Sequence, residues 1–247
     1  MKLWQTRRHW EKFARTDPLW AVLTAPGKEG NRWTLDEFFA TGEQDVVATL
    51  AAIHARHPTL ARRRALDFGC GVGRLTQALA GEFKHATGVD IAADMIALAR
   101  QHNRRGDRVT YIHHTSADLS CFAAGSFDLV MSLITLQHIA PEYSRRYIAE
   151  FLRVCAPGGI VYFQAPAERL VPHKTRSLSL YPPSVAKRVW RLWNRCFALK
   201  PIMEMHVLPR EEVLAIIRSA GGEVLAADDC AKTGQEFSSY AYLARKM

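Results

Sequence analysis

The stretch ALDFGCGVGRLTQALA, residues 65–80, decides the fold. A short apolar run meets glycines at alternate positions, Gly69, Gly71 and Gly73, and then a helical pattern of apolar residues. This order predicts a strand, a tight loop and the N-terminus of a helix. Because glycine has no Cβ, such a loop lets a ligand lie directly against the main chain. The stretch therefore predicts a loop that binds a nucleotide-type cofactor.

The spacing of the glycines argues against a dinucleotide. A dinucleotide fingerprint needs a glycine three positions after Gly71, where this chain has Arg74. Asp67, at the expected carboxyl end of the strand, would repel phosphates but would form a charge-assisted hydrogen bond with a cation. The stretch favours a cofactor that carries an ammonium and a sulfonium group.

A second acid follows at the distance expected of a nucleotide site. Residues 85–90 are predicted to form a second strand, and its last residue, Asp90, comes 17 positions after Gly73. A carboxylate in this place binds the ribose hydroxyls in nucleotide-binding units. The alternative is that Asp90 caps the N-terminus of the helix that follows.

The next two strands bring a third acid to the same edge of the sheet. Residues 109–113 alternate like a strand and lead to Asp118, which is placed where an adenine amino group could be read. Residues 126–133 are predicted to form a fourth strand, apolar from Leu129 on, as is typical of a strand buried on both faces. The cofactor would lie across the carboxyl ends of these strands.

The chain resembles the class I S-adenosylmethionine (SAM)-dependent methyltransferases of the small-molecule type. Four motifs carry the resemblance, in order: ALDFGCGVG (65–73), GVDIAADMIALAR (88–100), SADLSCFAAGSFDLVMSLITLQHI (116–139) and LRVCAPGGIVYFQ (152–164). With a last helix and two last strands, the resemblance covers roughly 65–165 and 207–247. It implies an α/β, Rossmann-like fold: a seven-stranded, mostly parallel sheet with helices on both faces and an antiparallel last strand.

The resemblance also implies a SAM pocket and its contacts. The loop of Gly69, Cys70, Gly71 and Gly73 would approach the methionine part of SAM. Asp67 would lie near its amino group, and Asp90 would hold the ribose. The other implied contacts are Ile91 and Met95 on sugar and base, Asp118 and Leu119 at the adenine, and Leu133 and Gln137 facing the sulfur.

We expect one methyltransferase domain over residues 1–247, with two variable parts around a core at 61–165 and 207–247. Residues 1–60 are rich in tryptophan and carry a capping-box signature at 34–37, so we expect a helical cap on the SAM pocket. The alternative is that the tryptophans pack on the outside of the sheet. Residues 166–206 would form an inserted helical lid that builds the acceptor pocket.

The insertion is strongly basic. Residues 167–210 hold nine Lys or Arg residues against two acids, in a chain whose formal net charge is +9. Residues 184–199 read as an amphipathic helix, either a lid with a solvated basic face or a contact with a membrane surface or lipid-linked substrate. Nucleic acid is disfavoured as a partner, because base-modifying relatives carry an N/D-P-P-Y motif or a Pro-Cys nucleophile after the fourth strand, and residues 132–136 read SLITL.

Composition excludes other classes of protein. No apolar run of twenty residues occurs, and the first residues, MKLWQTRRHWEKF, lack the apolar centre of a signal peptide, so we expect a cytoplasmic protein. The five cysteines include no C-x-x-C pair, which argues against a disulfide framework or a structural zinc site. We expect no metal.

Methyl transfer from a sulfonium needs few side chains, because it is an in-line displacement promoted by near-attack geometry in a dry pocket. A hydroxyl acceptor would also benefit from a base that removes its proton. His138, just past the fourth strand, and His206, before the last helix, are the candidates. Their alternative roles are structural, as a cap or brace.

The expected function is O-methylation of a small molecule, most simply a sugar or secondary metabolite. N- or C-methylation of an aromatic or polyketide-like metabolite would use the same fold. A SAM-binding, membrane-associated module without methyl transfer is the alternative from another class, although the cofactor loop is intact.

Overall fold

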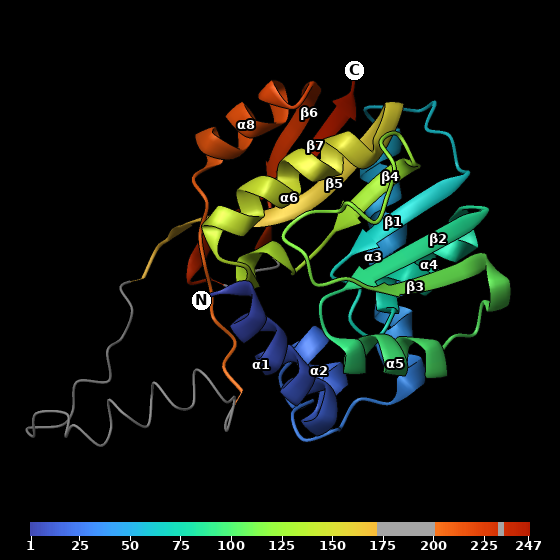
Figure 1. Cartoon of the computed structure of the whole chain (residues 1–247), viewed down its shortest axis with the longest axis vertical. Helices are drawn as coiled ribbons and strands as arrows, with labels where there is room; N and C mark the ends of the chain where they lie inside the picture. Colours follow the sequence, from blue (N-terminus) through green and yellow to red (C-terminus); the bar gives the residue numbers. More distant parts are fainter. Residues whose placement is uncertain (172–200, 232–234) are drawn as a thin grey trace, which may run out of the picture.

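The structure, a computed structural model, describes residues 1–171, 201–231 and 235–247 (Figure 1). Seven strands form one sheet in the order β3-β2-β1-β4-β5-β7-β6. β1 to β5 are parallel, and β7 runs antiparallel to its neighbours β5 and β6. The predicted seven-stranded, mostly parallel sheet is therefore confirmed. The strands are β1 (Arg64–Phe68), β2 (His85–Asp90), β3 (Val109–His113), β4 (Phe127–Ser132), β5 (Cys155–Arg169), β6 (Gly222–Asp229) and β7 (Phe237–Lys246).

Helices cover both faces of this sheet (Figure 1). α6 (Pro141–Val154) and α8 (Arg210–Ser219) pack on one face, and α3 (Leu35–His54), α4 (Arg74–Glu82) and α5 (Ala93–Gln101) on the other. Successive strand residues point to opposite faces, so each strand feeds two cores. Leu66, Val130 and Val161 belong to the first core, and Ala65, Leu129 and Ile160 to the second.

The N-terminal segment divides between core and cap. α3 packs against α4 and buries Val46, Leu50 and Ile53 in the second core, so it is part of the helical layer. Within residues 1–60, α1 (Leu3–Thr16) and α2 (Pro18–Val22) are the helices that lie over the carboxyl end of the sheet, so the cap is shorter than the predicted one of residues 1–60. The predicted capping box opens α3: the Glu37 N–H donates to Thr34 Oγ1 (3.3 Å), and the Thr34 N–H donates to Glu37 Oε2 (3.2 Å).

The chain on the far side of the insertion returns to α1. The Ile202 N–H donates to Nδ1 of the fully buried His9 (3.1 Å), and Met203 packs against the apolar cluster of α1 and α2. The predicted helix at 184–199 lies outside the described residues. Two short 3-10 helices, η1 (Gly106–Arg108) and η2 (Leu136–His138), complete the described chain.

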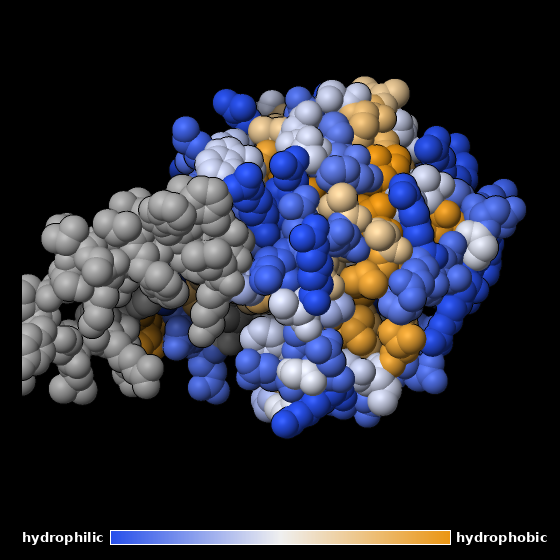
Figure 2. Space-filling view, turned by 60° about the horizontal axis from the view of Figure 1, so that its bottom comes forward, coloured by the Kyte–Doolittle hydropathy of each residue, from blue (hydrophilic) through white to orange (hydrophobic). Residues whose placement is uncertain are grey.

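The face of the molecule shown in Figure 2 is mainly hydrophilic, and apolar side chains are exposed between the charged ones. On α1, Trp4 is 43% exposed, and the Arg8 guanidinium lies 5.3 Å from the centre of its ring. Within the described parts of the chain, no helix combines the length and the apolar character that crossing a bilayer requires.

Candidate functional site

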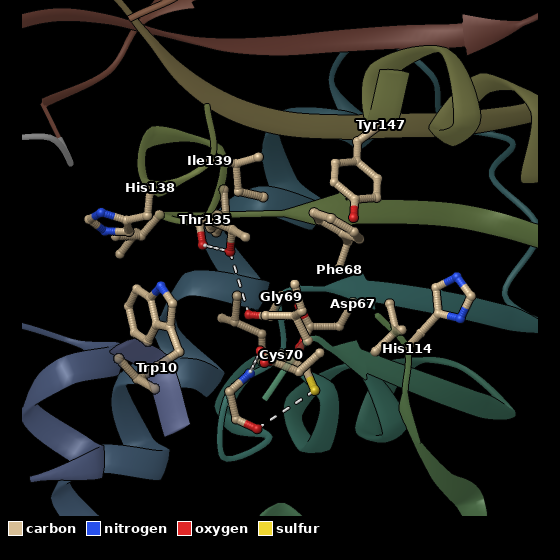
Figure 3. A pocket seen from close by; sticks show the side chains of 18 of the residues that line it. Trp10, Asp67, Phe68, Gly69, Cys70, His114, Thr135, His138, Ile139 and Tyr147 are labelled. Atoms are coloured by element: carbon tan, nitrogen blue, oxygen red, sulfur yellow. Dashed lines mark hydrogen bonds between the residues drawn. The ribbon is translucent and has the colours of Figure 1, made fainter. Parts of the chain in front are cut away.

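A cavity opens at the carboxyl ends of β1, β2 and β4, beneath α1 and α2 (Figure 3). The space between its walls is about 910 Å³, part of it open to solvent. The chain runs outward from β1 to β3 and returns to β4 beside β1. Parallel α/β sheets bind ligands where the strand order reverses in this way, so the topology makes this cavity the candidate binding site.

The glycine loop after β1 forms the floor of the cavity. Gly69 has φ +74°, and a Cβ there would lie 2.2 Å from Thr135 Cγ2. Gly73 has φ +86°, and its Cβ would lie 2.2 Å from the Tyr111 hydroxyl oxygen. Both positions therefore need glycine for backbone conformation and for space. Gly69 lines the cavity, whereas Gly73 lies behind it and serves the turn into α4.

Asp90 stands at the end of β2 and holds the loop. Its Oδ2 accepts a hydrogen bond from the Gly71 N–H (2.9 Å), and its Oδ1 accepts one from the Ala92 N–H (2.8 Å). Burial raises the pKa of this carboxyl group, and the backbone N–H groups oppose that rise. The N-cap of α5 is Ala92, so Asp90 supports the start of this helix without being its cap.

Asp67 carries a buried carboxyl group near the carboxyl end of β1. The side chain is 1% exposed, and Oδ2 accepts a hydrogen bond from Thr76 Oγ1 (2.6 Å). Burial raises its pKa to about 6, and the positive charge of Arg74 limits the rise. Because a buried carboxylate is costly without a counter-charge, a cation in this cavity would favour the ionised form.

Most of the predicted SAM contacts come together here. Asp67, Gly69, Cys70, Gly71, Asp90, Ile91, Leu119 and Leu133 all line the cavity. Further lining residues were not among the predicted contacts: Phe68, His114, Thr135 and Tyr147, together with Leu3, Thr6, Trp10 and Val22 of the cap. The Tyr147 ring packs 4.6 Å from that of Phe68, and its hydroxyl group donates to the Ser116 carbonyl (2.7 Å).

Four of the predicted contacts do not line the cavity: Gly73, Met95, Asp118 and Gln137. Met95 is buried in the apolar cluster under α1 and α2. The half-exposed carboxylate of Asp118 turns back to accept hydrogen bonds from the Ser120 N–H (3.1 Å) and hydroxyl group (2.8 Å), which lower its pKa. An aspartate that bonds the backbone two residues on is a common turn device, and Oδ1 of Asp118 also lies 3.5 Å from Nε2 of His114, which does line the cavity.

Comparison with known proteins agrees with this geometry. Residues 65–159 match the family described as Methyltransferase domain. Residues 65–159 are therefore a methyltransferase domain, and they include the glycine loop, Asp67 and Asp90.

One curated relative is the ubiquinone biosynthesis O-methyltransferase of Aromatoleum aromaticum (strain DSM 19018 / LMG 30748 / EbN1). It is 34% identical over 109 residues, 44% of this chain and 46% of that protein. The chain thus spans about half the length of the curated relatives it matches.

Solved structures show the same fold along nearly the whole chain. Magnesium protoporphyrin IX methyltransferase from Synechocystis PCC 6803, with bound S-adenosylhomocysteine (SAH), superposes with a TM-score of 0.63 at 17% identity and covers 98% of both chains. The N-methyltransferase NodS from Bradyrhizobium japonicum WM9, in complex with SAH, gives 0.62 at 18% identity and the same coverage.

His138 is held by protein groups at both ring nitrogens. Nδ1 lies 2.8 Å from the Glu204 carbonyl oxygen, which can only accept, so Nδ1 carries the hydrogen. Nε2 faces Gln137 Nε2 at 3.1 Å and accepts from that amide. Burial lowers the pKa of His138 to about 4. Contrary to the expectation of a base, this geometry leaves no lone pair for an acceptor proton.

The second candidate base, His206, lies outside the main cavity. His206 does not line the main cavity but borders a smaller pocket behind η2, with Leu136, Pro166 and Leu208. Its Nε2 lies 3.4 Å from Glu204 Oε2, and burial lowers its pKa. The backbone N–H of His206 donates to the Gln137 carbonyl (2.7 Å), so this residue braces η2 from outside the cavity.

Proposed function

We propose that this protein transfers the methyl group of SAM to a small-molecule acceptor, O-methylating a secondary metabolite or sugar. The observation that carries the proposal is the meeting of the glycine loop, Asp67 and Asp90 in one cavity at the carboxyl ends of β1 and β2. The fold neighbours with bound SAH support the same cofactor.

The residues present fit SAM. A buried carboxylate with a raised pKa, Asp67, suits an ammonium group, and the missing Cβ of Gly69 leaves the loop backbone open to a ligand. Asp90 would hold the ribose hydroxyls, and the apolar side chains of Ile91 and Leu119 would pack against the base. When bound, SAM supplies an electrophilic methyl group on a sulfonium.

The acceptor side of the cavity is mainly apolar. Leu3 and Trp10 reach it from α1, and Ile134 and Ile139 from the chain after β4. Figure 3 shows the His138 ring beside Trp10, with its nitrogens turned away from the glycine loop; the ring centres lie 5.3 Å apart. Apolar and aromatic walls favour an acceptor with an apolar ring system over a free sugar. This wall would orient the acceptor and exclude water, which is most of what methyl transfer requires.

N-methylation of an aromatic metabolite is the second candidate, because an N-methyltransferase shares the fold and the aromatic wall suits either acceptor. The basic helix that the sequence predicts at 184–199 would favour a lipid-linked acceptor, but it lies outside the described residues. One assay distinguishes these methyltransferase candidates from a SAM-binding module without methyl transfer.

That assay incubates the purified protein with methyl-labelled SAM and an extract of its own host, and then partitions the products between water and an organic phase. We expect label in the organic phase, as the apolar wall indicates. Label in water would indicate a free sugar, and no transfer at all, despite SAH binding, would indicate a module without methyl transfer. Mass spectrometry of the labelled product then identifies the methylated atom.

Affinity for SAH is expected to fall as the pH falls through about 6. The pKa of Asp67 is raised to about 6 in the ligand-free protein, and only its ionised form attracts the ligand's ammonium group, which stays charged in this range. Below pH 6 the affinity should therefore drop by up to about tenfold per pH unit. Isothermal titration calorimetry from pH 5 to 8 measures this. Asp67→Asn should bind more weakly at pH 8 and show a flat profile, and an unchanged slope in this variant would assign the titration to another group.

His138→Asn is expected to keep kcat within about tenfold of the wild type. The Asn amide can donate to the Glu204 carbonyl as Nδ1 does, and loss of a general base would instead cost roughly 10²–10⁴-fold. The measurement is kcat against pH for both proteins with the identified acceptor. A loss above 10²-fold, together with a changed pH profile, would restore His138 as the base.

A further inference from the structure

Arg74 is a buried cation in the wall of the cofactor cavity. It is the first residue of α4, directly after the glycine loop, and it is 2% exposed. Among the described residues that line the cavity, it alone carries a permanent positive charge, and the same wall also holds Asp67 and Asp90. A buried arginine needs a compensating anion.

One end of the guanidinium is fixed by α3. Nη1 donates to Asp45 Oδ2 (2.7 Å) and to Thr41 Oγ1 (3.1 Å). α3 approaches this closely because residue 42 is glycine: a Cβ there would lie 2.4 Å from the Arg74 carbonyl oxygen. The side chain is thus held in one orientation before any ligand arrives.

The other end of the guanidinium is left unsatisfied. Nε is buried and finds no hydrogen-bond partner among the described residues. Leaving a buried donor without an acceptor costs free energy that a ligand oxygen would recover. The guanidinium donates in a planar fork that matches a carboxylate, and its Nη1 is already used by Asp45, so the Nε edge is the one available.

We propose that Arg74 binds the carboxylate of the amino-acid end of SAM, while Asp67 binds its ammonium group. This assignment rests on the proposed function. The amino acid of SAM carries both charges on one carbon, and the cavity wall presents a carboxylate, Asp67, and a cation, Arg74, close enough for their charges to interact. Asp45 and Thr41 act as positioning residues that aim the guanidinium. A purely structural Arg74–Asp45 ion pair would explain neither the unpartnered Nε nor the place of Arg74 in the cavity wall.

Two ligands that differ only in the carboxylate test the proposal. SAH carries it, and decarboxylated SAH keeps the amine and lacks the carboxylate. Calorimetry at pH 8 should show that the wild type prefers SAH by at least about tenfold, as expected for a charge-assisted, bidentate pair. Arg74→Gln should weaken SAH binding by about the same factor and leave decarboxylated SAH nearly unchanged.

The control is Arg105→Gln. Arg105 also pairs with an acid of α3, Glu43 (3.2 Å), but it lies outside the cavity lining. This variant should bind both ligands as the wild type does. Arg74→Gln removes the ion pair between Arg74 and Asp45. If that variant does not fold, Arg74→Lys replaces it in the test, because Lys keeps the charge and should retain only part of the preference for SAH.

Equal binding of the two ligands by the wild type would overturn the role of Arg74 and leave SAM binding intact. So would an Arg74→Gln variant that loses affinity for both ligands equally. Failure of the wild type to bind either ligand would overturn the proposed function itself, and the inference with it.

Discussion

Replacing Asp90 with alanine is expected to lower the affinity for SAH by about 100-fold. The two ribose hydroxyls would lose hydrogen bonds to a charged acceptor, each worth roughly 1.5–3 kcal/mol, and about 3 kcal/mol in total corresponds to about two powers of ten in Kd. The variant also frees the Gly71 N–H, which Asp90 holds at 2.9 Å, so the loop loses its anchor. Isothermal titration calorimetry with SAH measures the loss.

Two variants separate these effects. Asp94→Ala removes an acid four positions further on, whose carboxylate pairs with the exposed Arg15 (2.7 Å) outside the cavity lining. It should leave the affinity for SAH within about twofold, because such a pair contributes little. Asp90→Asn keeps one oxygen acceptor without the charge, and should fall between the wild type and Asp90→Ala. Wild-type affinity in Asp90→Ala would show that the ribose is held elsewhere.

The parts of this molecule that could be predicted from sequence are those set by local pattern. The glycines at 69, 71 and 73 and the apolar runs beside them fixed the loop, and the acids that end β1 and β2 came to its edge because parallel strands end together. β1 and β2 are each followed by their own helix, α4 and α5, so this part of the fold follows the local sequence pattern.

The rest of the site depends on contacts between distant segments. Tyr147 and Thr135 reach the cavity from α6 and from the chain after β4, and Trp10 reaches it from α1. The spacing of residues in the sequence does not predict that these three side chains line the cavity. His138 was chosen as a base for its place after β4, but its ring nitrogens bond to Gln137 and, 66 positions away, to the Glu204 carbonyl. The protonation of a buried histidine is decided by such partners, which only the fold brings together.

Gly69→Ala is expected to destabilise the protein by about 3 kcal/mol and to abolish measurable SAH binding. A left-handed backbone costs a residue with a Cβ roughly 1–2 kcal/mol, and overpacking adds about 1–3 kcal/mol. The new Cβ would lie 2.2 Å from Thr135 Cγ2 and 2.5 Å from its Oγ1. In a chain of this size the melting temperature should fall by roughly 6–12 °C, which thermal unfolding followed by circular dichroism measures.

Gly27→Ala separates the cost of backbone strain from the cost of a steric clash with a neighbouring side chain. Gly27 has nearly the same backbone angle, φ +77°, but nothing lies within 4 Å of its Cβ position. It should therefore lose only the strain, about 1 kcal/mol, or roughly 2–4 °C. Adding Thr135→Ala to Gly69→Ala removes the two nearest atoms and should recover part of the difference. If Gly69→Ala melted at the same temperature as Gly27→Ala, the loop would not be wedged against Thr135, and glycine there would serve the backbone and the ligand alone.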